Sequence, residues 1–261
     1  MTVTIDEIKK KCSDERYFAY DSLQDRLFVP VAMCLVWLFV RIGVSGNAVS
    51  WLSALAAVLG AFLLTSSDSS VVLIGSFGYI LWCLLDYVDG AVARFNGKGS
   101  VAGQYIDWIM HVIAHIAIIA GIAIGAMNSV GAWIYPFAIL GIVAAGLSYA
   151  KFSMAWFAVC MEQQQRRASS HDVRNWAKTE IVPASGRLWL WFDYIRRLTV
   201  VIFHENFLIF TLPVMAALQL SQVLGFIDLR VVFTVLAGVL YFPVQVLEIH
   251  RLVVTKRIQR G

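Results

Sequence analysis

The sequence predicts an all-α, polytopic membrane protein, a helical bundle of six transmembrane helices preceded by an N-terminal interfacial amphipathic helix. Hydrophobic residues make up 59% of the chain and charged residues only 15%, whereas soluble domains carry roughly 25% charged residues. Apolar runs that approach the roughly 20 residues of a membrane-spanning helix recur along the whole chain. The four cysteines form no CxxC pair, so neither a disulfide framework nor a structural zinc site is predicted.

Six apolar segments are long enough to cross a membrane. An earlier apolar stretch, 27–40, lies between Arg26 and Arg41 and is too short for a span, so it is predicted to lie in the membrane interface. A second interfacial helix is predicted at 187–203, where Trp and Tyr residues alternate with arginines. The expected spans are 47–65, 70–90, 104–126, 131–155, 206–224 and 230–248.

The distribution of positive charge supports this assignment and predicts an orientation. Nineteen of the 21 Lys and Arg residues precede the first span, follow the last, or fall in the connections after the second and fourth spans. On the opposite side there is one, Arg230, and Lys151 falls within the fourth span. The positive-inside rule therefore predicts that both termini are cytoplasmic.

Three regions follow from this topology. They are a cytoplasmic N-terminus with the interfacial helix (1–45), a six-span catalytic membrane domain (46–250) and a basic cytoplasmic tail (251–261). The first 20 residues lack the apolar region of a signal peptide, so a bacterial cytoplasmic (inner) membrane is expected. The polar connection 161–187 is interpreted as a solvated loop, or alternatively as a lid beside the site.

Ionisable residues cluster near one end of the second and third spans, although such groups are costly in a membrane and normally mark function. Asp86 and Asp89 are three residues apart, so they share a helix face. On the next helix Asp107, His111 and His115 recur every four residues and share another face. Both faces are expected to meet at the cytoplasmic end of a helical hairpin.

This cluster predicts metal-assisted phosphoryl chemistry. Crowded carboxylates remain ionised only when cations lie between them, and three Asp donors suit Mg²⁺ or Mn²⁺. Two such ions can hold a pyrophosphate. Gly90 and Gly103 let the backbone approach a ligand, and Arg94 offers a planar donor for phosphate.

The same residues resemble the signature of the CDP-alcohol phosphotransferase family (CDP-alcohol phosphatidyltransferases), D-x2-D-G-x2-A-R-x8-G-x3-D-x3-D. His111 stands where the signature has its fourth Asp. Upstream, S-G-N-A-V-S at 45–50 is similar to the family's T-P-N-x-V-T, with Gly46 in place of the Pro. Seven of the eight fixed positions match: Asp86, Asp89, Gly90, Ala93, Arg94, Gly103 and Asp107.

The resemblance implies a phospholipid-biosynthetic transferase in the membrane, which uses one or two Mg²⁺ or Mn²⁺ ions. A CDP-linked donor, expected to be CDP-diacylglycerol, would be attacked at its β-phosphate by an alcohol acceptor, releasing CMP. A homodimer is expected, and no nucleic-acid partner. The implied metal ligands are Asp86, Asp89, Asp107 and His111; the implied catalytic residues are His111, Asp107 and Asp89; and the implied nucleotide and phosphate contacts are Asn47, Gly90, Ala93, Arg94 and Gly103.

Several alternatives remain open at the sequence level. His111 could be a metal ligand or a base, and its loss of one negative charge weakens the case for a second Mg²⁺ and favours Mn²⁺ or Zn²⁺. His115 is interpreted as a packing group or a further ligand. The competing functions are a divalent-metal or proton-coupled transporter, whose sites usually lie at the midplane of repeated halves, and a catalytically silent relative that keeps the fold.

Overall fold

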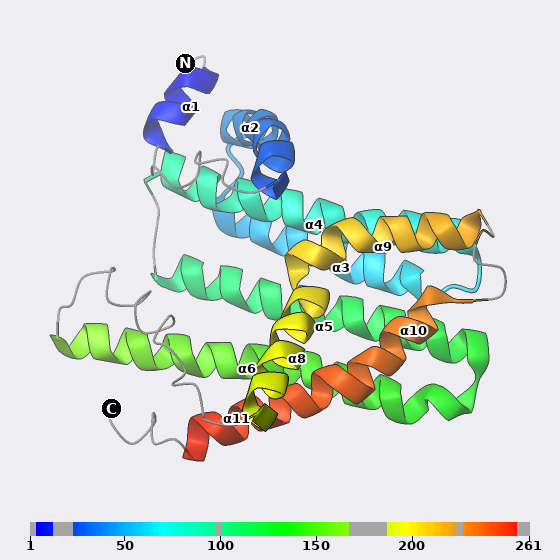
Figure 1. Ribbon diagram of the computed structural model, residues 1–261. Helices are drawn as coiled ribbons and strands as arrows, with labels where there is room; N and C mark the ends of the chain where they lie inside the picture. The colour runs from blue at the N-terminus through cyan, green and yellow to red at the C-terminus, as the bar shows by residue number, and fades with distance from the viewer. Residues whose placement is uncertain are drawn as a thin grey trace.

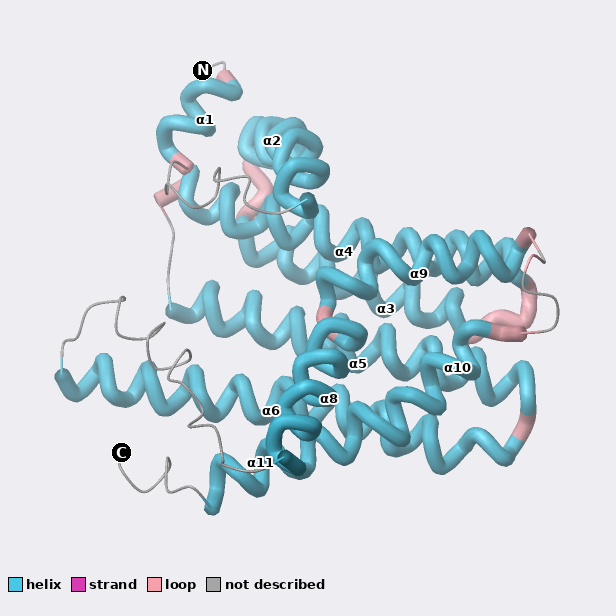
Figure 2. Tube along the Cα trace, viewed as in Figure 1, coloured by secondary structure: helices cyan, strands magenta, loops and turns pink. Residues whose placement is uncertain are grey.

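The computed structural model describes residues 4–12, 23–97, 101–166, 187–221, 223 and 227–254. Within these residues every regular element is helical and there is no strand (Figure 2), so the predicted all-α class is confirmed. The α-helices are α1 (Ile5–Lys11), α2 (Leu23–Ile42), α3 (Gly46–Leu64), α4 (Ser69–Phe95), α5 (Val101–Val130), α6 (Tyr135–Arg166), α8 (Arg187–Phe203), α9 (Glu205–Leu220), α10 (Leu229–Leu236) and α11 (Phe242–Val254). A 3₁₀ turn, η1 (Ala132–Ile134), precedes α6, and a π-helical segment, η2 (Ala237–Tyr241), joins α10 to α11.

Six described helices are long and apolar enough to cross a membrane, as predicted, but they are not all the predicted six. Five correspond to predicted spans, and the sixth is α2. The predicted span 206–224 is represented by α9, which reaches a spanning length only together with α8, from which it is bent by 66°. Counting that bent pair as one span gives seven. The six are Leu23–Ile42, Gly46–Leu64, Ser69–Phe95, Gly103–Val130, Ala132–Ala150 and Leu229–His250.

The two helices predicted to be interfacial run across the bundle. In Figure 1, α3, α4, α5 and α6 lie along a common direction, whereas α2 is seen end-on and α8 crosses the others. Both transverse helices lie at a similar level along the bundle axis in this view. The placement of α2 and α8 in the membrane interface stays a prediction. By length and composition α2 (Leu23–Ile42) could itself cross a membrane, and it is longer than the 14-residue stretch 27–40 on which the prediction was based.

The centre of the bundle is held by glycines that bring helix backbones into contact. A Cβ atom on Gly78 of α4 would lie 2.5 Å from the Cα of Gly60 in α3, and one on Gly121 of α5 would lie 2.4 Å from the Ala61 carbonyl oxygen. Without a hydrophobic driving force in lipid, such close packing of small residues is a main source of helix association. It makes α3 the common neighbour of α4 and α5.

The N-terminal helices dock on the second half of α4. The Gln24 amide of α2 donates to the Cys83 sulfur at 3.0 Å, and the Tyr87 hydroxyl donates to Asp25 at 2.6 Å. The Cys12 thiol, directly after α1, donates to the Ala91 carbonyl at 3.3 Å. These contacts fix α1 and α2 beside the turns of α4 that carry Asp86 and Asp89.

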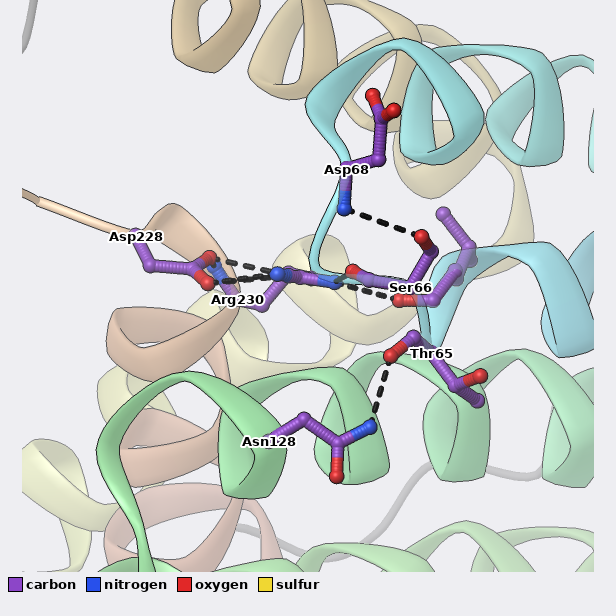
Figure 3. Close-up of polar contacts among 7 residues, drawn as sticks. Thr65, Ser66, Asp68, Asn128, Asp228 and Arg230 are labelled. Carbon is purple, nitrogen blue, oxygen red and sulfur yellow. Dashed lines mark hydrogen bonds and ion pairs between the residues drawn. The ribbon is translucent and has the colours of Figure 1, made fainter.

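The end of the bundle that holds the α3–α4 connection carries a polar network with a buried ion pair at its centre (Figure 3). The Arg230 guanidinium, in a residue only 5% exposed, pairs with Asp228 at 2.8 Å and donates to the Leu64 and Ser66 carbonyls, each at 2.7 Å. The Asn128 amide of α5 donates to the Thr65 carbonyl at 2.8 Å. The network ties the start of α10 and the end of α5 to the α3–α4 connection.

Candidate metal and phosphate site

The candidate site lies between the last three turns of α4 and the first turns of α5, at the end of the bundle opposite Arg230. Asp86 faces α5, while Asp107 and His111 face back from successive turns of α5. The His111 Nε2 atom lies 2.8 Å from Asp86 Oδ1 and 3.7 Å from Asp107 Oδ1. One ligand atom from each of the three residues lies within 4.8 Å of the other two. Of the five ionisable residues expected to meet at this end, Asp86, Asp107 and His111 therefore do so.

The Asp89 side chain is hydrogen-bonded to α3 and does not belong to this three-residue group. Its carboxylate accepts a hydrogen bond from the Ser50 hydroxyl of α3 at 2.5 Å, and the residue is only 6% exposed. The same hydroxyl lies 3.3 Å from the Gly46 carbonyl. Among the described residues, the group that could hold a metal ion contains Asp86, Asp107 and His111 but not Asp89.

Gly46 explains how α3 comes this close to the acidic turn of α4. A Cβ atom at Gly46 would lie 2.8 Å from the Asp89 carbonyl oxygen and 2.9 Å from the Ala93 Cβ atom. Ser45 caps α3 by accepting the Ala48 amide, so the helix begins at this contact. Asn47 follows Gly46 on the exposed side, which leaves its amide accessible at the site end.

Arg94 and Gly90, the two α4 residues predicted to bind phosphate, lie next to each other. A Cβ atom at Gly90 would lie 3.2 Å from an Arg94 guanidinium nitrogen, so the guanidinium lies over the glycine one turn earlier. A larger residue at 90 would displace it. Gly103, the other predicted glycine, lies in the first turn of α5 and is partly buried.

Two residues near the site were not identified from the sequence as functional. Ser50 belongs to the 45–50 segment that resembles the family, and its position one helical turn after Gly46 is the signal that could have marked it. Trp82 lies one turn before Asp86, and its ring packs edge-on against His111 with centroids 5.1 Å apart. It is in turn stacked on Tyr79 at 4.8 Å, so the His111 ring is held in one orientation.

His115 lies one turn deeper than His111 and is nearly fully buried. Its ring packs against Tyr149 of α6 with centroids 5.0 Å apart, and it does not belong to the three-residue group. The contact is that of a packing residue. The predicted loop or lid at 161–187 and the predicted basic tail 251–261 fall mostly outside the described residues.

The donor set fits a divalent cation. Two carboxylates and one imidazole nitrogen are ligands that Mn²⁺, Zn²⁺ and, less well because of the nitrogen, Mg²⁺ accept. An ion held by these three atoms would still have coordination positions for other ligands. Arg94 lies two turns along α4 from Asp86, where its planar guanidinium can bind a phosphate oxygen pair.

Comparison with known protein families gives a match that includes this site. The profile of the family described as CDP-alcohol phosphatidyltransferase matches residues 43–202, more than half of the chain. The matched region begins just before α3 and includes α4, α5 and α6, so it contains both halves of the motif. A comparison with curated proteins gave no match.

Proposed function

Since the chain belongs to the CDP-alcohol phosphatidyltransferase family, a family of phosphotransferases that use CDP-alcohols, we propose that it transfers a phosphatidyl group from CDP-diacylglycerol to a hydroxyl acceptor and releases CMP in phospholipid biosynthesis. The observation that carries the proposal is the convergence of Asp86, Asp107 and His111 within 4.8 Å at the matched motif. A divalent ion held there would neutralise the diphosphate and stabilise the charge that develops on it during transfer.

The residues of the site would divide the work as follows. Arg94 and the backbone beside Gly90 and Gly103 would bind the diphosphate, and Asn47 would contact the nucleotide from the start of α3. The acceptor oxygen would form a bond to the β-phosphorus as the bond from that phosphorus to CMP breaks. Asp107, whose side chain is 45% exposed, is the accessible carboxylate that would take the acceptor proton.

The location of the site is also part of the proposal. The α1 helix, with Lys9, Lys10 and Lys11 in its last turn, lies at the same end of the bundle as the motif (Figure 1). By the positive-inside rule this end faces the cytoplasm, where a soluble alcohol could enter and CMP could leave. The protein would then be an integral protein of a bacterial inner membrane with both termini cytoplasmic, acting as the homodimer that the resemblance implies.

The test is CMP release by purified protein in lipid nanodiscs with CDP-diacylglycerol, a panel of polar alcohols, and Mg²⁺ or Mn²⁺. Asp86→Asn should lower CMP release by about 100-fold, since one of three ligands loses its charge. Asp68→Asn is the matched control. It removes one carboxylate at the opposite end of α4, where Asp68 accepts the Ser70 amide as the helix cap, and Asn caps equally well.

CMP release that depends on an alcohol, falls in Asp86→Asn and persists in Asp68→Asn supports the proposal. Release that is equal in both variants would place the chemistry elsewhere. If wild-type protein releases no CMP with any alcohol in the panel, the phosphatidyl-transfer proposal is wrong, and other CDP-alcohol donors become the next substrates to measure.

A further inference from the structure

The metal cluster of this chain has an unusual donor set for a site that binds a diphosphate. One of its three ligand atoms is an imidazole nitrogen, His111 Nε2, at 2.8 Å from Asp86 Oδ1 and 3.7 Å from Asp107 Oδ1. An ion with ligand bonds of about 2.1 Å places neighbouring ligand atoms about 3.0–3.4 Å apart. Small side-chain rotations would therefore place all three atoms on one face of a single ion.

The His111 ring packs against a buried aromatic pair. The Trp82 and His111 rings pack nearly perpendicular to each other, and Tyr79 stacks on Trp82. Both aromatic residues are nearly fully buried. Packing that fixes the ring of a ligand in this way lowers the cost of assembling a metal site.

The fourth carboxylate, Asp89, is held away from the cluster by α3. Ser50, itself only 4% exposed, donates to it at 2.5 Å. Gly46 keeps α3 in van der Waals contact with the Asp89 turn of α4, which holds the Ser50 backbone beside this carboxylate. A second ion would need this carboxylate, because the cluster already lacks the negative charge that an Asp at position 111 would supply.

We propose that the site binds one transition-metal ion, Mn²⁺ or Zn²⁺, in preference to Mg²⁺, through Asp86, Asp107 and His111, and that Ser50 is a positioning residue that holds Asp89 out of this coordination. Imidazole nitrogen favours transition metals over Mg²⁺, which selects oxygen ligands. The inference deepens the proposed function, because the ion concerned is the one that would hold the donor diphosphate.

The test measures metal binding without any CDP compound, in metal-free protein in nanodiscs. Isothermal titration should give one Mn²⁺ or Zn²⁺ per chain, bound about tenfold or more tightly than Mg²⁺. Pulsed electron paramagnetic resonance of bound Mn²⁺ should show coupling to a ¹⁴N nucleus. His111→Asp should abolish that coupling and shift the affinity ratio towards Mg²⁺. Equal affinities for Mn²⁺ and Mg²⁺, two ions per wild-type chain, or Mn²⁺ without nitrogen coupling would each overturn the proposal.

The role of Ser50 has its own variant and control. Ser50→Ala should increase Mn²⁺ affinity, because the freed Asp89 carboxylate can turn towards the ion. Ser53→Ala is matched to it, since Ser53 is buried on the same helix but donates to the Ser50 carbonyl at 2.7 Å and not to Asp89. Equal Mn²⁺ affinities in both variants would overturn the role given to Ser50.

This experiment separates the inference from the proposed function. Selective binding of one Mn²⁺ with ¹⁴N coupling, in protein that releases no CMP, would leave the inference standing and count against phosphatidyl transfer. CMP release supported equally by Mg²⁺ and Mn²⁺, with equal affinities for the two ions, would support phosphatidyl transfer and overturn the proposed metal selectivity.

Discussion

The two ends of the bundle differ in whether their charged side chains are neutralised by other protein groups. At the end where α3 meets α4, the Arg230 guanidinium is surrounded by the Asp228 carboxylate and two backbone carbonyls that all accept its hydrogen bonds. At the other end, Asp86 and Asp107 approach each other around His111, and both repel the nearby Asp89 carboxylate. The Arg230 guanidinium is neutralised and hydrogen-bonded by protein groups alone, whereas the acidic cluster becomes favourable only when a cation binds to it.

The contrast teaches that the same helices can serve stability at one end and function at the other. Both ends are joined by α3, α4 and α5, whose middle turns are packed through glycines. The cost of crowded carboxylates at the site is therefore offset by packing and hydrogen bonds some 20 residues away along the same helices. Such separation is expected where a site is preorganised for a ligand rather than for its own stability.

The largest effect on stability should come from breaking the Arg230 network. Arg230→Met leaves the buried Asp228 carboxylate unpaired and two carbonyls without a donor, so we expect a loss of about 3–5 kcal/mol in the free energy of unfolding. Thermal or denaturant unfolding in detergent measures it. The specific activity of the protein that remains folded should not change, because Arg230 lies at the end opposite the motif.

A double variant shows whether the loss reflects an uncompensated charge. Asp228→Asn together with Arg230→Gln removes both charges while Asn keeps the helix cap on the Arg230 amide. It should cost less than Arg230→Met alone. An equal or larger loss would mean that the ion pair itself, and not the burial of an unpaired charge, stabilises this end.

Two glycines allow the ends to be compared by one chemical change. A Cβ atom at Gly125 would lie 2.4 Å from the Leu64 carbonyl oxygen and 2.5 Å from the Arg230 guanidinium. One at Gly46 would meet the Asp89 carbonyl at 2.8 Å. Each Gly→Ala variant should lose about 1–3 kcal/mol of stability by overpacking, with Gly125→Ala the more harmful because it displaces the guanidinium.

Activity should distinguish the two variants. Gly46→Ala pushes Ser50 and Asn47 away from the acidic turn and should also lower CMP release per folded molecule, whereas Gly125→Ala should not. Gly146→Ala is the control, because no atom lies within 4 Å of its added Cβ and Ala favours a helix. A loss in Gly146→Ala comparable with the other two would mean that the effects do not come from the close contacts of Gly46 and Gly125.

Neutralising an acid at the functional end should raise stability instead. Asp89→Asn removes a buried charge that Asp86 and Asp107 repel, and the Asn oxygen can still accept the Ser50 hydroxyl. We expect the metal-free protein to gain about 0.5–2 kcal/mol in the free energy of unfolding. Unfolding with and without Mn²⁺ measures the gain. A loss of stability in metal-free Asp89→Asn would show that repulsion between these carboxylates does not destabilise this end of the bundle.

The comparison also explains which parts of the molecule could be read from the sequence. The alignment of Asp107 with His111, and their approach to Asp86, depend on helical periodicity and a short connection, so spacing predicts them. The full length of α2 was missed because Gln24 and Asp25 are polar. They belong to the helix through their bonds to Cys83 and Tyr87, which are tertiary contacts.

The position of Asp89 was beyond sequence reasoning for a similar physical reason. Whether a carboxylate on α4 faces α5 or α3 depends on how far one helix is rotated against another. Here the Gly46 contact with Ala93 sets that rotation, and it places Ser50 rather than Asp107 in hydrogen-bonding distance of Asp89. Motif spacing assigns the four site residues to two helix faces but does not fix which neighbour each one contacts.

The smallest effect concerns the docking of α1 at the functional end. Burial raises the pKa of the Cys12 thiol, with Arg94 and Lys11 partly opposing the increase, and the thiol donates to the Ala91 carbonyl. In protein whose other cysteines are replaced by serine, Cys12 should react with N-ethylmaleimide about fivefold more slowly when folded than when unfolded in detergent, a difference of about 1 kcal/mol. Because the raised pKa lowers the thiolate fraction, the folded rate should continue to rise at alkaline pH after the unfolded rate has levelled. Equal rates in the two states would mean that α1 does not dock on α4, and that the acidic turn is supported by α2 and α3 alone.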